Sequence, residues 1–280
     1  MKILKNQIVK GKHKPIYVDL FYKENNIQKP IVLFVHGYKG FKDWGCWDLI
    51  AKTFAENDVL FIKMNFSHNG TTAENTTEFA DLEAFGHNNF SKEIDDLQTV
   101  IDWIYEEKSI QQNCNLDHIA LIGHSRGGGT VTLMANEDKR ITKLITWAGV
   151  SDFGARFPSG EILEEWKKRG VAYITNTRTN QQMPHYIQFY EDYVQHKERF
   201  SIKKASQNIQ IPTLILHGTH DETVLLAEAE NLHAWNKNSK LIVIENANHT
   251  FGGTHPWEKD HLPEYLNEVV KNSIVFVINL

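Results

Sequence analysis

The segment "GHSRG" at 123–127 places one serine, Ser125, between two glycines. The apolar run "HIALI" precedes it and a stretch rich in small residues, 126–136, follows it, so we predict a turn between a buried strand and a helix. Glycines two residues to either side leave room for a tight turn that strains the backbone and exposes the hydroxyl. A helix N-cap serine would not need this spacing. We therefore predict that Ser125 is a nucleophile.

A serine hydroxyl attacks a carbonyl only when a base takes its proton and a third group orients that base. His249 is the best candidate for the base, because "ENANHTFGG" forms a loop directly after the last predicted strand. Asp221 in "LHGTHDETV" follows a buried strand and precedes His249, so we predict that it is the orienting acid. Asp152 also follows a predicted strand and remains an alternative, and Glu222 is a weaker one.

Attack on a carbonyl carbon develops negative charge on the carbonyl oxygen, and losing one hydrogen-bond donor to that oxygen costs about 10²–10³ in rate. The segment 36–40, "HGYKG", follows the apolar run "IVLFV" directly. Its glycines allow backbone N–H groups to turn toward the serine. We predict that the backbone N–H groups of Tyr38 and Arg126 form this oxyanion hole.

These side chains need a scaffold, and the apolar pattern indicates one. Several strand-length runs are continuously apolar, which is typical of strands covered on both faces in a parallel sheet. Helix-period segments separate them, at 91–108, 126–136, 223–236 and 262–280. The alternation predicts an α/β fold with a mostly parallel, doubly wound sheet, formed by 1–150 and 206–280. The runs are 16–22, 31–35, 59–66, 118–122, 144–150, 213–218 and 241–245.

The segment 151–205 interrupts this alternation, since it has many charges, scattered aromatic residues and no strand-like apolar run. Long insertions in compact domains are usually functional or disordered, and the aromatic content argues against disorder. We predict a helical cap over the strand ends. Its aromatic residues Phe189, Tyr190 and Tyr193 are candidates for the walls of a substrate pocket. Its charges differ from the wide apolar face of a lipase lid.

Composition excludes several function classes. The chain has 280 residues, 41% of them hydrophobic, and a formal net charge of -5, without a basic cluster for nucleic acid. Its two cysteines make no disulfide framework. The N-terminal segment lacks the apolar core of a signal peptide, and no run reaches the roughly 18 apolar residues of a membrane span. We expect a cytoplasmic protein without membrane or nucleic-acid partners, and the sequence allows a homodimer.

No cofactor or metal is indicated by the motifs. The glycine-rich "GHSRGGG" lacks the lysine of a phosphate-binding loop, and no dinucleotide fingerprint occurs. His217 and His220 lie near Asp221, but a histidine pair in a turn without a third soft ligand is weak evidence for zinc. We expect neither a cofactor nor a metal site.

Four segments, "FVHGYKGFKDWG", "GHSRGG", "LHGTHDETV" and "ANHTFGG", together resemble serine hydrolases of the α/β-hydrolase superfamily. The order Ser125, Asp221, His249 is the order of that fold. The chain is most similar in its motifs to bacterial dienelactone-hydrolase-like and cinnamoyl (feruloyl) esterase-type proteins. Dienelactone hydrolases proper have a cysteine where this chain has Ser125, so the resemblance does not extend to their substrate class.

The resemblance implies hydrolysis of a small-molecule ester of a short-chain or aryl (hydroxycinnamoyl-like) acid through an acyl-enzyme. Peptidase, thioesterase and lipase chemistry use the same groups and stay open. Prolyl-oligopeptidase relatives carry a propeller domain ahead of the hydrolase, whereas about 30 residues precede "IVLFV" here, which disfavours a peptidase. A non-catalytic ligand-binding protein is the alternative from another class, and a complete set of three catalytic groups argues against it.

Overall fold

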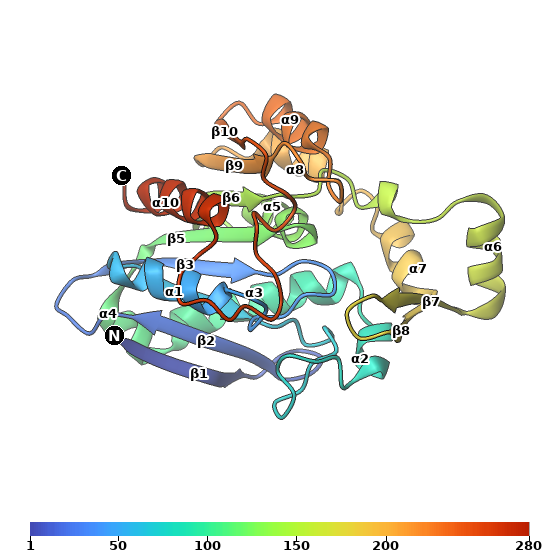
Figure 1. Ribbon diagram of the computed structural model, residues 1–280, viewed down its shortest axis with the longest axis horizontal. Helices are drawn as coiled ribbons and strands as arrows, with labels where there is room; N and C mark the ends of the chain where they lie inside the picture. Colours follow the sequence, from blue (N-terminus) through green and yellow to red (C-terminus); the bar gives the residue numbers. More distant parts are fainter. Residues whose placement is uncertain (280) are drawn as a thin grey trace.

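A computed structural model of the protein describes residues 1–279. Its centre is an eight-stranded sheet with the order β1-β2-β4-β3-β5-β6-β9-β10 (Figure 1). Strand β2 runs antiparallel to both of its neighbours, and all the other neighbouring pairs are parallel. The predicted α/β class with a mostly parallel sheet is therefore confirmed. The strands are β1 (Lys2–Val9), β2 (Ile16–Tyr22), β3 (Lys29–Val35), β4 (Leu60–Met64), β5 (Cys114–His124), β6 (Ile141–Trp147), β9 (Thr213–Gly218) and β10 (Ser239–Ile244).

Helices cover both faces of this sheet, which explains the continuous apolar runs. On β3, Leu33 packs into one apolar cluster with α3 (Phe90–Glu106) and α5 (Arg126–Glu137). Its neighbour Phe34 points to the opposite face and packs with α1 (Trp47–Glu56) and α10 (Glu264–Ile278). No helix within residues 1–279 is long and apolar enough to cross a membrane. The remaining core helices are α2 (Leu82–Gly86), α4 (Lys108–Asn113), α8 (Ile202–Asn208) and α9 (Leu226–Trp235).

One strand of the sheet, β1, was not expected from the apolar pattern. It lies at the edge, pairs only with β2, and leaves most of its side chains at least partly exposed. An edge strand is held by backbone hydrogen bonds to one neighbour and needs no apolar run. This is why the sequence "KILKNQIV" carries no strand signal.

The cap projects from one end of the sheet and contains a short 3-10 helix, η1 (Gly154–Arg156), α6 (Gly160–Arg169), a β-hairpin and α7 (Gln188–Gln195) (Figure 1). The expectation of a purely helical cap is wrong, because β7 (Val171–Asn176) and β8 (Gln181–Tyr186) pair antiparallel. Five of the six residues of β7 are at least partly exposed, and β8 contains a proline. Neither strand therefore has the continuous apolar run by which a buried strand is predicted. Helix α8 begins inside the segment predicted as cap and packs into the core cluster instead.

Candidate active site

Ser125 lies on the turn between β5 and α5, as its sequence context predicts. Its backbone φ is 57° and ψ is -123°, a conformation that L-residues rarely adopt. The surrounding structure holds this strain, since the Ser125 N–H donates to the carbonyl of Trp147 over 2.9 Å. The flanking glycines are required for close approach. A Cβ on Gly127 would lie 2.6 Å from the carbonyl oxygens of Val35 and His36, and one on Gly123 would collide with the backbone of Gly127.

Ser125, His249 and Asp221 form a chain of hydrogen bonds. The Ser125 hydroxyl lies 2.9 Å from Nε2 of His249, and Nδ1 of His249 lies 2.8 Å from Oδ2 of Asp221. Because a carboxylate can only accept, Nδ1 carries the proton and Nε2 is free to accept the serine proton. The three residues follow β5, β9 and β10, and the carboxyl ends of parallel strands meet at one edge of the sheet.

The structure decides between the candidate acids. Oδ1 of Asp221 accepts the backbone N–H groups of Thr223 and Val224 over 2.9 Å and 2.8 Å, which leaves Oδ2 for the histidine. The rival, Asp152, is exposed and accepts the N–H of Gly154 over 2.7 Å. Glu222 is also exposed. Asp221 is therefore the carboxylate that orients His249.

Two buried histidines support this chain, and the sequence reading assigned neither of them a role. Burial opposes ionisation of Asp221, but hydrogen bonds from His217 and His249 hold its pKa well below the usual range. Nε2 of His217 lies 3.3 Å from Oδ2 of Asp221 and 2.7 Å from the carbonyl of Val224. Nε2 of His124 donates to the carbonyl of His249 over 2.9 Å. Burial lowers the pKa of His124 to about 3, so it stays neutral.

The sequence did carry a signal for these supporting residues. His124 is the residue before Ser125, and His217 is the penultimate residue of β9. Both therefore stand at the same strand ends as the groups that they support. Position alone could not separate them from the other histidines at strand ends. The partner of His124 is His249, which lies on a loop distant in sequence. The partner of His217 is Asp221, only four residues on, but the sequence does not show how the loop between them folds.

The loop 36–40 lies directly against the serine. A Cβ on Gly37 would come within 2.7 Å of Cβ of Ser125, so this loop approaches as closely as a glycine allows. The backbone N–H groups of Tyr38 and Arg126 have no hydrogen-bond partner elsewhere in residues 1–279. Free N–H groups beside a nucleophile are the arrangement that stabilises an oxyanion.

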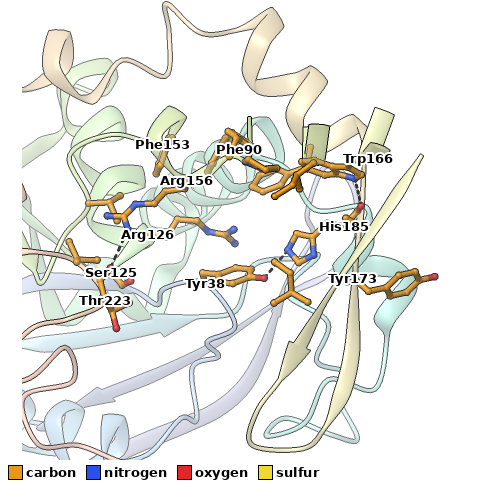
Figure 2. Close-up of a pocket in the computed structure, with 18 residues that line it drawn as sticks. Tyr38, Phe90, Ser125, Arg126, Phe153, Arg156, Trp166, Tyr173, His185 and Thr223 are labelled. Atoms are coloured by element: carbon orange, nitrogen blue, oxygen red, sulfur yellow. Dashed lines mark hydrogen bonds between the residues drawn. The ribbon is translucent and has the colours of Figure 1, made fainter. Parts of the chain in front are cut away.

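The side chain of Tyr38 connects this loop to the cap. Its hydroxyl lies 2.8 Å from Nε2 of His185 in β8, and the guanidinium of Arg126 lies 5.0 Å from its ring centre (Figure 2). Burial lowers the pKa of His185 to about 4, so the ring is neutral and Nε2 accepts from the tyrosine hydroxyl. The carbonyl of His185 in turn accepts from the indole of Trp166 over 2.7 Å.

A cavity of about 640 Å³ opens between the core and the cap, with Ser125 in its wall (Figure 2). The predicted wall residue Phe189 lines it, but Tyr190 and Tyr193 do not. These two tyrosines pack against Phe157, with ring centres 5.3 Å and 5.1 Å away. The prediction that they form the cavity wall is therefore wrong. The aromatic wall residues are Tyr38, Phe90, Phe153, Phe157, Trp166, Tyr173 and Phe189.

A group of carboxylates elsewhere in the fold has the spacing of a cation site. Oxygens of Asp19, Asp43 and Asp48 lie within 4.8 Å of one another, the one such group among residues 1–279. Lysine ammonium groups already occupy the space between them. Nζ of Lys42 lies 2.9 Å from Asp19, and Nζ of Lys63 lies 2.9 Å from Asp43. The cluster is therefore a partly buried ion-pair network rather than a metal site.

The model of the prolyl oligopeptidase family matches residues 48–273. The chain belongs to the prolyl oligopeptidase family. A curated relative, the "Uncharacterized peptidase YuxL" of Bacillus subtilis (strain 168), is 25% identical over 183 residues, which cover 63% of this chain and 25% of the relative. The chain thus spans about a quarter of the length of the relative that it matches.

Solved structures show the same architecture. Est1E from Butyrivibrio proteoclasticus with bound ferulic acid has a TM-score of 0.70 at 20% identity, covering 97% of this chain and 99% of that one. Dienelactone hydrolase from Anabaena variabilis has a TM-score of 0.66 at 16% identity, covering 98% and 95%. Family and fold confirm the resemblance to α/β-hydrolase serine hydrolases. The relatives' names include a peptidase and a dienelactone hydrolase, so they do not agree on one substrate class. The cavity is the feature of this chain that bears on its substrate.

Proposed function

We propose that this protein is a serine hydrolase that cleaves carboxylic esters of short-chain or aryl acids through an acyl-enzyme. The observation that carries the proposal is the chain of hydrogen bonds from Ser125 through His249 to Asp221, which ends in the wall of a cavity. Among described residues, these three supply a nucleophile, a base and an orienting acid. A protein that only bound a ligand would not need these three side chains joined by hydrogen bonds.

The reaction follows from this geometry. Oγ of Ser125 attacks the ester carbonyl while its proton moves to Nε2 of His249, and Asp221 stabilises the imidazolium. The carbonyl oxygen becomes negative and accepts hydrogen bonds from the backbone N–H groups of Tyr38 and Arg126. As the intermediate collapses, His249 returns the proton to the leaving alcohol and an acyl-Ser125 ester remains. A water molecule, deprotonated by His249, then attacks that ester and releases the acid.

The cavity supports small acyl groups as substrates. Its volume of about 640 Å³ lies in the range of pockets for small molecules, and seven of the 18 residues that line it are Phe, Tyr or Trp. Aromatic walls favour flat groups, which stack against them and bury apolar area. The exposed side chains of α6, "GEILEEWKKR", are charged apart from Ile162, whereas a surface that docks on lipid is widely apolar. We therefore expect no interfacial activation and poor turnover of chains of twelve or more carbons.

Peptide hydrolysis is the second candidate, because the chain belongs to the prolyl oligopeptidase family. The same three groups would cleave an amide, with His249 protonating a leaving amine. Thioesters are a further variant of the same chemistry. The three classes differ only in the group that leaves, so a panel of leaving groups on a common acyl group separates them.

The test combines labelling with a substrate panel. A fluorophosphonate probe is expected to label the wild type once, at Ser125, and not the Ser125→Ala variant. Ser159→Ala, which removes an exposed cap serine, is the control and should label normally. The panel comprises p-nitrophenyl acetate, butyrate and palmitate and methyl ferulate. It also includes one peptidyl acyl group as its p-nitrophenyl ester, its thioester and its p-nitroanilide.

We expect the highest kcat/KM on butyrate or ferulate. Labelling that persists without Ser125 would refute the proposed nucleophile. A preference for palmitate over butyrate, or for the anilide over every ester, would refute the proposed substrate class.

A further inference from the structure

The side chain of Arg126 enters the cavity beside the serine (Figure 2). Three aromatic rings surround its guanidinium, with ring centres at 5.0 Å for Tyr38, 5.8 Å for Phe189 and 6.0 Å for Phe90. Glu93, on the core side, forms an ion pair with this guanidinium, and its Oε1 lies 2.5 Å from Nη2 of the arginine. The side chain of Arg126 is 15% exposed and that of Glu93 1% exposed, so the guanidinium is fixed inside the wall.

Most hydrogen-bond donors of this guanidinium are unused. A guanidinium carries five N–H groups in one plane. In the described part of the chain, the bond to Glu93 is the only hydrogen bond that the Arg126 side chain donates. The aromatic rings make no conventional acceptor for the remaining donors. No nitrogen of Arg126 is among the fully buried side-chain atoms that lack a partner in residues 1–279, so its free donors are accessible from the cavity. A ligand acceptor there can replace the water that would otherwise bind them.

The second arginine in the wall differs in this respect. The guanidinium of Arg156 donates to the carbonyl of Thr223 over 3.2 Å and also pairs with Glu228. Both of its terminal nitrogens thus already have partners in the protein. Among the described residues, it is not surrounded by aromatic rings as Arg126 is. This makes Arg156 a natural control for Arg126, since both line the same cavity.

Charge balance indicates which acceptor fits. Glu93 already compensates the positive charge of Arg126, and no carboxylate side chain is among the described residues that line the cavity. A carboxylate brought into this apolar space would lose its hydration without gaining a net countercharge. A neutral oxygen loses far less hydration and still gains a charge-assisted hydrogen bond.

We propose that Arg126 recognises an uncharged acceptor oxygen, such as a carbonyl, ether or phenol oxygen, at the far end of an aryl acyl group. This inference rests on the proposed ester hydrolysis. Arg126 is the residue after Ser125, so the same backbone turn fixes both the nucleophile and the guanidinium. The acyl group that satisfies both is therefore rigid, flat and polar at its distal end.

Three p-nitrophenyl benzoates of nearly equal shape test this. Their para substituents are isopropyl, which offers no acceptor, acetyl, which offers a neutral carbonyl, and carboxylate, which is charged. Each kcat/KM is divided by the rate constant of the same ester with hydroxide, so that intrinsic reactivity cancels. For the wild type we expect acetyl to exceed isopropyl by about 10-fold or more, as for a hydrogen bond to a charged group. Carboxylate should fall below acetyl.

Arg126→Met is expected to bring the acetyl-to-isopropyl ratio close to 1, and Arg156→Met to leave it unchanged. Any loss of overall rate in either variant cancels in the ratio. A wild-type ratio near 1, or a ratio that survives Arg126→Met, overturns the inference while ester hydrolysis stands. Carboxylate above acetyl overturns the neutral acceptor. If the wild type hydrolyses p-nitrophenyl butyrate but none of the three benzoates, the inference fails while the proposed ester hydrolysis stands. If it hydrolyses none of these four esters, the proposed function fails and the inference fails with it.

Discussion

The core and the cap form opposite sides of one cavity, but different interactions hold them in place. Ser125 and Asp221 follow β5 and β9, which parallel backbone hydrogen bonds connect through β6. The cap meets the core through individual side chains instead. Ser91 donates to Asp192 over 2.5 Å, and Tyr38 bonds His185 over 2.8 Å. Backbone ladders tolerate few changes, whereas single side-chain contacts can be replaced one at a time. The core should therefore decide whether an ester is cleaved, and the cap which ester.

The largest effects are expected in the core. Ser125→Ala and His249→Ala should each lower kcat by about 10⁴–10⁶-fold, and the double variant should lose hardly more, because the groups act as a unit. Circular dichroism should show a folded protein, since neither side chain contributes to the sheet. Additive losses in the double variant would mean that His249 is not the base for Ser125.

Asp221→Asn should lower kcat by about 10⁴-fold, because an amide in place of the carboxylate no longer holds His249 in the required tautomer. The control is Asp152→Asn, whose exposed side chain should matter by less than about 3-fold. Steady-state kinetics on p-nitrophenyl butyrate measures both. If Asp152→Asn were inactive and Asp221→Asn active, the orienting acid would be Asp152, in the loop after β6, and not Asp221.

A cap variant should have a smaller effect. His185→Phe removes the acceptor for Tyr38, so the loop 36–40 loses its connection to β8. We expect kcat to fall by about 10-fold through misplacement of the Tyr38 N–H, with a smaller change in KM. His185→Gln retains an acceptor and should recover most of the loss.

Tyr38→Phe completes a double-mutant cycle for this contact. The pair Tyr38→Phe and His185→Phe should lose no more than either variant alone. Independent losses would show that His185 acts on the substrate directly rather than through Tyr38.

The smallest expected effect concerns pH and the stability of the cap contact. Burial lowers the pKa of His185 to about 4, with Arg126 and Lys39 nearby acting in the same direction. In the unfolded chain His185 takes up a proton near pH 6.5, whereas in the folded protein it stays neutral down to about pH 4. The free energy of unfolding therefore falls as the pH decreases from 7 toward 4. His185→Gln should reduce this fall between pH 7 and pH 5 by about 2 kcal/mol.

Urea unfolding at the two pH values measures the difference. The other buried histidines contribute equally to the wild type and the variant, so they cancel in the comparison. Identical pH dependence in both proteins would show that His185 does not resist protonation.

The core was predictable because its signals are local. The turn at Ser125 requires small residues at 123 and 127, and the strands before Ser125 and Asp221 are continuously apolar. The cap was less predictable. Its hairpin, 171–186, is held by backbone pairing between half-exposed strands, and its sequence has no apolar alternation. The edge strand β1 was missed for the same reason.

The α/β class, the three residues at the strand ends and their order could be predicted from the residues alone, because a strained serine turn and buried parallel strands leave local patterns. Tertiary structure alone decided which aromatic residues face the cavity, turning Tyr190 and Tyr193 away and bringing in Phe90 from α3. It also decided that the buried His217 supports Asp221 and that His185 holds Tyr38. The contact between His185 and Tyr38 joins segments distant in the chain. His217 and Asp221 are only four residues apart, but the fold of the loop between them brings their side chains together. In both cases the direction of a side chain depends on how the elements pack.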